Sequence, residues 1–124
     1  MINQTLLYIG SGLTLSWGIA HLFPTRSVVQ GFGEITIDNK RIITMEWIIE
    51  GIFLIFIGLL CAGSNFLFPA SFNALYIYLL SSIFLVILAI VSLLTGFKIN
   101  FLPFKLCPLI FSVSAILIIS GALL

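Results

Sequence analysis

Residues 42–61 read IITMEWIIEGIFLIFIGLLC, and the rest of the chain can be understood from this run. It is as long as the ~20 predominantly apolar residues that an α-helix needs to cross a bilayer. It nevertheless contains two carboxylates, Glu46 and Glu50, four positions apart. Residues with this spacing share one face of a helix. Because ionisable side chains inside a membrane segment are costly and usually face the protein interior, this pair is the first candidate for a functional site.

The composition of the whole chain is also typical of a membrane protein. Of its 124 residues, 61% are hydrophobic and only 7% are charged. A soluble protein of this size needs more polar surface, because its exterior must meet water. The formal net charge of +1 gives no basic surface for nucleic acid. The expected partners are therefore the lipid bilayer and either further copies of the chain or another membrane protein.

Four apolar segments predict the fold. They cover residues 4–23, 42–62, 72–95 and 104–124, and each is near the ~20 residues of a membrane span. Pro24 cannot continue the first helix, Ser71 is a suitable N-cap for the third, and Gly96 is a suitable residue to end it. The sequence thus predicts an all-α membrane protein, a single domain of four transmembrane helices in an up-down-up-down bundle.

The basic residues predict the orientation of this bundle. Arg26, Lys40 and Arg41 lie in the first connection, and Lys98 and Lys105 flank the third. The second connection, residues 62–71, carries no charge. Since positively charged connections stay in the cytoplasm, both termini are expected outside.

The connection 24–41, PTRSVVQGFGEITIDNKR, is the only long one. Loops above about 12 residues are uncommon unless they are functional or disordered. Apolar residues such as Val28, Val29 and Phe32 argue against disorder, and Asp38-Asn39 is a turn signal. Two interpretations remain open: a linker lying in the membrane interface, or a lid over a site.

A polar cluster is expected where the first and second helices meet on the cytoplasmic side. His21 ends the first segment, and Glu50 lies only about 10 Å beyond the start of the second apolar run at ~1.5 Å per residue. His21, Glu46 and Glu50 are therefore the candidate catalytic or proton-carrying groups. The run Gly10, Thr14 and Gly18 would let the two helices approach closely.

The apolar wall of this candidate site is expected from four residues, namely Trp17, Trp47, Phe53 and Leu54. The alternative for the two tryptophans is a role as interfacial anchors or packing residues. His21 could equally be a hydrogen-bonded residue at a helix end, and Glu46 could extend its carboxylate to water.

Three functions fit such a cluster. The first is binding of a lipid-like ligand or a partner protein; the second is acid–base catalysis on an isoprenoid or sterol-like substrate. The third is proton-linked transport by an oligomer, because two nearby carboxylates in a low dielectric cannot both ionise cheaply. No metal site is predicted, since there is one histidine and no nearby cysteine. No cofactor can be named, because nucleotide-binding and haem-attachment motifs are absent from the sequence.

Two stretches carry a family resemblance: SWGIAHLFPT (16–25) and GFGEITIDNKRIITMEWIIEGIFLIFIGLL (31–60). With the size and helix number, they resemble small bacterial four-helix membrane proteins, broadly of the DoxX-like kind. The resemblance implies a bacterial inner-membrane bundle with no settled activity. It assigns no functional residue, because the pattern around His21 and Glu46 does not match a motif of that family.

Overall fold

The computed structural model describes residues 2–124, and in this part of the chain all regular structure is helical. The elements are α1 (Gln4–Leu22), α2 (Thr25–Gln30), α3 (Ile37–Leu67), α4 (Phe72–Leu94), the 3₁₀ helix η1 (Gly96–Lys98) and α5 (Leu102–Leu123). The all-helical fold class predicted from the sequence is confirmed.

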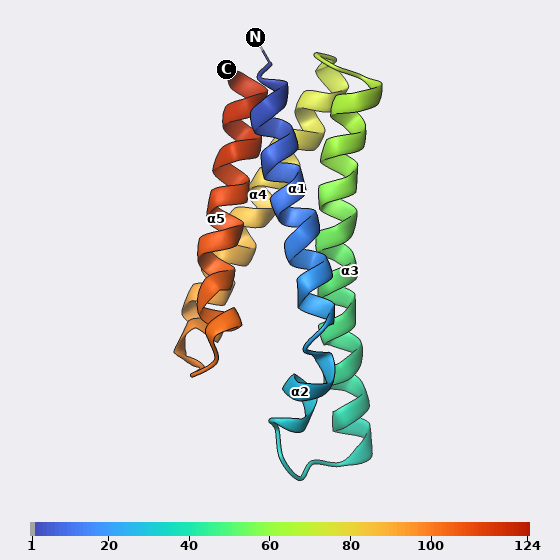
Figure 1. The fold of residues 1–124 in the computed structure, drawn as a ribbon, viewed down its shortest axis with the longest axis vertical. Coiled ribbons are helices and arrows are strands. Elements are labelled where there is room, and N and C mark those ends of the chain that lie inside the picture. Colours follow the sequence, from blue (N-terminus) through green and yellow to red (C-terminus); the bar gives the residue numbers. More distant parts are fainter. Residues whose placement is uncertain (1) are drawn as a thin grey trace.

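The long helices lie side by side along one axis (Figure 1). α1 packs against both α3 and α5, and α4 packs mainly against α5. The contact between α3 and α4 is much smaller. Both chain ends and the α3–α4 turn lie at one end of the molecule, and α2 lies at the other (Figure 1).

Three helices are long and apolar enough to span a membrane: α3, α4 and α5. The outer surface of α4 is apolar too, since Ile83, Val86 and Ile90 are each about half exposed. A helix that is hydrophobic all round needs lipid or protein on every side. These features indicate a membrane protein. α1 is shorter, and its buried side includes Ser11, Thr14 and His21.

α3 is longer than the predicted segment 42–62 at both ends. It begins at Ile37 because the Thr36 hydroxyl accepts a hydrogen bond from the Asn39 amide at 3.2 Å. Asp38 and Asn39, interpreted as a turn from the sequence, instead form the first helical turn. At the other end the helix runs through Gly63 and stops only at Leu67, just before Pro69.

The stretch 24–41 is therefore not one continuous loop. It contains α2, which follows Pro24 directly, and it ends in the first residues of α3. Val29 of α2 is buried, and α2 packs against α3. The remaining connection between α2 and α3 is short, and Gly33 provides its one positive φ, 71°.

Small residues set the position of α1. A Cβ atom on Gly18 would lie 2.7 Å from the Ile55 backbone nitrogen and 2.9 Å from the Gly51 carbonyl oxygen. Such closeness requires glycine where α1 crosses α3. Gly10, expected on the same contact, instead faces α5, at Leu117 and Ile118. The small residues of α1 therefore serve two neighbours.

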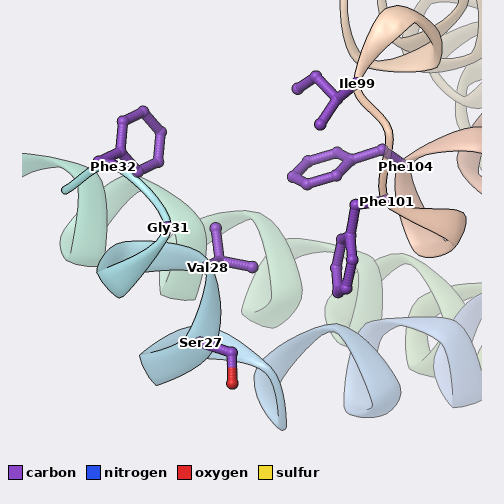
Figure 2. A pocket seen from close by; sticks show the side chains of 7 residues that line it. All are labelled: Ser27, Val28, Gly31, Phe32, Ile99, Phe101 and Phe104. Carbon is purple, nitrogen blue, oxygen red and sulfur yellow. The ribbon is translucent and has the colours of Figure 1, made fainter.

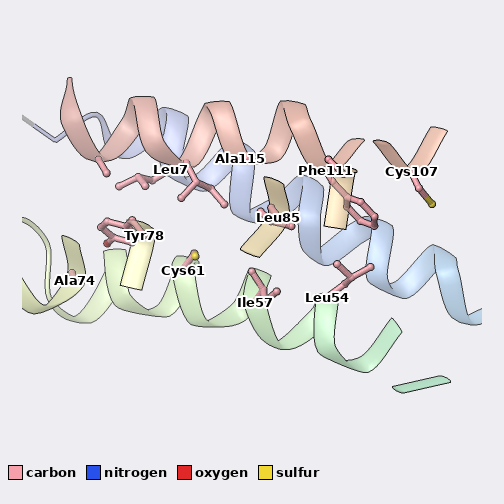
Figure 3. Packing of buried hydrophobic residues seen from close by; sticks show 13 residues of the cluster. Leu7, Leu54, Ile57, Cys61, Ala74, Tyr78, Leu85, Cys107, Phe111 and Ala115 are labelled. Carbon is pink, nitrogen blue, oxygen red and sulfur yellow. The ribbon is translucent and has the colours of Figure 1, made fainter. Parts of the chain in front are cut away.

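The core lies along the inner face of α3, where Leu54, Ile57 and Cys61 point toward side chains from α1, α4 and α5 (Figure 3). Leu54, Tyr78 and Leu85 are fully buried. The buried residues of α3 all lie between Gly51 and Asn65, so its earlier turns are left to surround the polar residues.

Candidate functional site: a histidine–glutamate pair between two hollows

The structure brings His21 and Glu50 together. The Gly18–Gly51 contact places the end of α1 against α3, and His21 Nε2 lies 3.5 Å from Glu50 Oε2. The His21 side chain is 5% exposed, whereas that of Glu50 is 42% exposed. Within residues 2–124, Nε2 makes no hydrogen bond. His21 and Glu50 are therefore close enough for an electrostatic interaction, but in the described residues the His21 Nε2 atom has no hydrogen-bond partner.

Trp47 fixes the position of this imidazole. Its ring stacks on that of His21, with centroids 3.9 Å apart and 17° between the planes. Its indole Nε1–H also donates a hydrogen bond of 2.8 Å to the His21 carbonyl oxygen. The last carbonyls of a helix lack partners within the helix. Trp47 thus supplies a donor to the end of α1 and holds the ring beside Glu50.

Glu46 lies apart from the histidine. It is exposed, and no ion pair involving it occurs in the part of the chain that the structure describes. It nevertheless lies on the same groove as Glu50. Of the three polar groups predicted from the sequence, two form the pair and the third lines the groove beside it.

This groove runs between α3 and α4 and has a volume of about 420 Å³. It is lined by Ile42, Ile43, Glu46, Trp47, Ile49, Glu50 and Phe53 from α3 and by Phe84 and Leu88 from α4. Phe53 and Phe84 meet edge to face, with ring centroids 5.0 Å apart. The lining therefore combines two carboxylates with an otherwise apolar, partly aromatic wall.

Trp47 also lines a second hollow. It has a volume of about 130 Å³ and is lined by Trp17, Ala20, His21, Pro24, Trp47, Pro103, Phe104 and Cys107. Phe104 meets Trp47 edge to face at 5.4 Å. The buried Nε1 of Trp17 has no hydrogen-bond partner within residues 2–124. We call this hollow the histidine cavity and the α3–α4 hollow the glutamate groove.

A third hollow adjoins the histidine cavity at Phe104 (Figure 2). It lies between α2 and the start of α5 and has a volume of about 370 Å³. In Figure 2, Val28 and Phe32 lie across from Ile99, Phe101 and Phe104. No residue lining it is titratable, so this apolar hollow offers space but no acid–base group.

The four residues expected as the apolar wall lie in different places. Phe53 and Trp47 line the glutamate groove, and Trp17 lines the histidine cavity. Leu54 is fully buried in the core and lines neither hollow. It lies on the inner face of α3, because it packs where α1 crosses at Gly18.

Sequence reasoning missed the contributions of α4 and α5. Phe84, Leu88, Phe104 and Cys107 complete the two hollows. The expectation that no cysteine lies near the site is wrong, because Cys107 lines the same hollow as His21; the predicted cytoplasmic position of Lys105, two residues away, was the available signal. Nothing in the spacing of Phe84 distinguishes it from the other large apolar residues of α4.

The arrangement offers acid–base and hydrogen-bonding groups. Among residues 2–124, no three His, Cys, Asp or Glu side chains come together to hold a metal ion. Comparison of the chain with protein-family models, with curated proteins and with solved structures gave no match. The inference of function therefore depends on the chemistry of the pair and of the two hollows.

Proposed function

We propose that the chain is a multi-pass protein of a bacterial inner membrane, with α1 as a fourth transmembrane helix in an up-down-up-down bundle. α1 packs along both α3 and α5, which supports a common path through the bilayer. α2, which contains Arg26, and the beginning of α3, which contains Lys40 and Arg41, lie at the end of the molecule opposite the termini (Figure 1). By the positive-inside rule that end is cytoplasmic and the termini are outside.

We further propose that the protein binds a lipid-like ligand in the glutamate groove. The observation that supports this most is that Glu46, Glu50 and an aromatic wall line one groove between two membrane-spanning helices. Ligand sites combine an apolar lining with a few polar groups that fix orientation. A groove open toward the bilayer admits an amphiphile from the side.

The lining also limits the chemistry of the ligand. Its only charged groups are carboxylates, so the polar end of the ligand must donate hydrogen bonds or carry positive charge. Phe53 lies one helical turn beyond Glu50 and packs against Phe84. An apolar tail would follow these rings toward the membrane centre, with a cationic head near the carboxylates and Trp47.

A proton-linked transport function is a second candidate. It is favoured by the separation of 3.5 Å between a buried imidazole and a half-exposed carboxylate, two groups that can share and release a proton. In that case His21 holds the proton and Glu50 exchanges it with the groove.

The binding proposal is tested with dodecylamine, dodecanol and dodecanoate as probes. In a Trp17→Phe protein, Trp47 is the only tryptophan and reports binding by its emission. Dodecylamine is expected to bind best, and Glu50→Gln is expected to weaken it at least tenfold, about 1.4 kcal/mol. Glu34→Gln removes an acid outside the groove and should change nothing. Equal binding by both variants would contradict the proposal.

The same variants separate the two functions. If the protein carries protons, addition of dodecylamine changes the internal pH of proteoliposomes by more than that of protein-free liposomes, and both Glu50→Gln and His21→Ala abolish the difference. If it only binds, Trp47 emission responds while the internal pH changes no more than in protein-free liposomes.

A further inference from the structure

A separate hollow lies between α2 and the beginning of α3. Its volume is about 520 Å³, and it is lined by Phe23, Thr25, Arg26, Val29, Gln30, Lys40 and Thr44. None of these residues lines the glutamate groove or the histidine cavity. Its only charged lining groups are the two cations, Arg26 and Lys40.

These cations have no carboxylate partner in the described part of the chain. Asp38, the nearest acid in sequence to Lys40, lies 3.6 Å from Arg41 instead. No ion pair within residues 2–124 involves Arg26 or Lys40. Lys105, by contrast, donates a hydrogen bond of 3.1 Å to the Phe97 carbonyl. The two charges in the hollow are thus available to an external anion.

The other lining groups suit an amphiphile. The hydroxyls of Thr25 and Thr44 already donate to backbone carbonyls, at 2.6 and 2.7 Å. The remaining donors are therefore the two cations and the Gln30 amide. Phe23 is 84% exposed and Val29 is buried. A strongly exposed phenylalanine beside two cations is suited to contact both the charged head and the apolar chain of an amphiphile.

We propose that this hollow binds the phosphate group of an anionic phospholipid. Arg26 and Lys40 come from different elements, so they can contact one phosphodiester from two sides, with Arg26 able to bind it through two N–H groups. A zwitterionic lipid fits less well, because its ammonium group would be repelled by the same cations. The acyl chains would then lie against Phe23. The proposal requires that this end of α3 lies in the headgroup layer, and it is independent of ligand binding in the glutamate groove.

The test is retention of lipid by the purified full-length protein in native mass spectrometry. The probes are dioleoylphosphatidylglycerol and dioleoylphosphatidylcholine, which share the same chains. The double variant Arg26→Gln/Lys40→Gln is expected to lose at least tenfold in phosphatidylglycerol retention. It should leave phosphatidylcholine retention unchanged. Arg41→Gln/Lys98→Gln also removes two positive charges outside this hollow, and it should behave as the unsubstituted protein.

Each other outcome rejects the proposal. Equal losses in both double variants would mean general attraction to surface charge, and no loss in either would mean that the hollow binds no phospholipid. A second measurement tests the apolar part: Phe23→Ser should weaken phosphatidylglycerol retention, and free glycerol phosphate should compete poorly. Full competition by glycerol phosphate would point to a site for a soluble phosphate compound. Circular dichroism verifies that every variant keeps its helices.

Discussion

At the scale of single residues, Trp47 connects the features of the candidate site. Its indole nitrogen donates to the His21 carbonyl, its ring stacks on the imidazole, and its side chain lines both the glutamate groove and the histidine cavity. Trp17, on α1, lines only the histidine cavity, and its buried Nε1 lacks a partner in the described chain. The two tryptophans are therefore a matched pair for mutation.

Trp47→Phe is expected to destabilise the protein, and Trp17→Phe is expected to change its stability much less. The first substitution keeps a ring against His21 but removes a hydrogen bond with a net value of about 1 kcal/mol. The second removes a buried donor that has no bond to lose. Unfolding in mixed micelles, followed by near-ultraviolet circular dichroism, gives both values. The reverse order of stabilities would contradict the contact between α1 and α3 at Trp47.

The polar residues show how far sequence reasoning reaches at this scale. The argument from equal depth on adjacent helices predicted that His21 lies near Glu50. In the structure His21 Nε2 lies 3.5 Å from Glu50 Oε2. The depth argument could not distinguish the contacts of Glu46 from those of Glu50, because it ignores the angle of each side chain around the helix axis. Over four residues that angle advances by about 40° beyond a full turn. That angle leaves Glu50 facing α1 and Glu46 on the exposed side. Only the crossing of α1 over Gly51 decides which of the two glutamates faces α1.

At the scale of the elements, the close approach of α1 and α3 governs where the site forms. Gly58 lies higher on the same contact as Gly18. A Cβ atom there would lie 2.7 Å from both the backbone nitrogen and the Cβ of Leu15, and 2.8 Å from the Ser11 carbonyl oxygen. Backbone atoms cannot move aside unless the whole of α1 shifts.

Gly58→Ala is therefore expected to destabilise the protein by about 1–3 kcal/mol, the usual cost of overpacking. Gly63→Ala is the control on the same helix, because a Cβ atom there meets nothing within 4 Å. Alanine favours a helix over glycine by up to about 1 kcal/mol. The two variants should thus shift the unfolding free energy in opposite directions. Equal stabilities would contradict the close contact.

Helix ends were harder to predict than helix positions. Ser71 was a predicted N-cap, and its hydroxyl does accept a hydrogen bond from the Ala74 amide at 3.0 Å. Thr36 was missed, because Asp38-Asn39 has the composition of a turn. An acid in the first turn also favours a helix N-terminus, and here that effect and the Thr36 cap prevail. The Thr36 cap and the turn-like pair Asp38-Asn39 are local signals of equal strength. The sequence alone does not show which one prevails, because that depends on the packing of α2 on α3.

At the scale of the whole molecule, α1 differs from the other long helices in length and composition. α3, α4 and α5 have the required length and composition. α1 has fewer apolar residues, because it contributes polar groups to the interior. Its buried small and polar residues, Gly10, Ser11, Thr14 and Gly18, lower its mean hydropathy although they pack against protein.

Single cysteines decide between three and four spans. Gln4→Cys and Asn73→Cys lie near the end with the termini, and Glu34→Cys lies beyond α2, at the opposite end. If α1 crosses the bilayer, a membrane-impermeant maleimide labels the first two in intact cells and the third only after permeabilisation. Both native cysteines are buried and add little labelling. Labelling of Gln4→Cys and Glu34→Cys from the same side would mean that α1 does not cross.

One indole forms part of the boundary of two hollows, and this has a thermodynamic consequence. A molecule that enters one hollow and displaces Trp47 also changes the lining of the other. Occupancy of the two hollows is then cooperative or antagonistic, and linkage requires the effect to be equal in both directions. A compound that enters beside His21 would therefore act as an allosteric effector of whatever binds beside Glu50, without touching it.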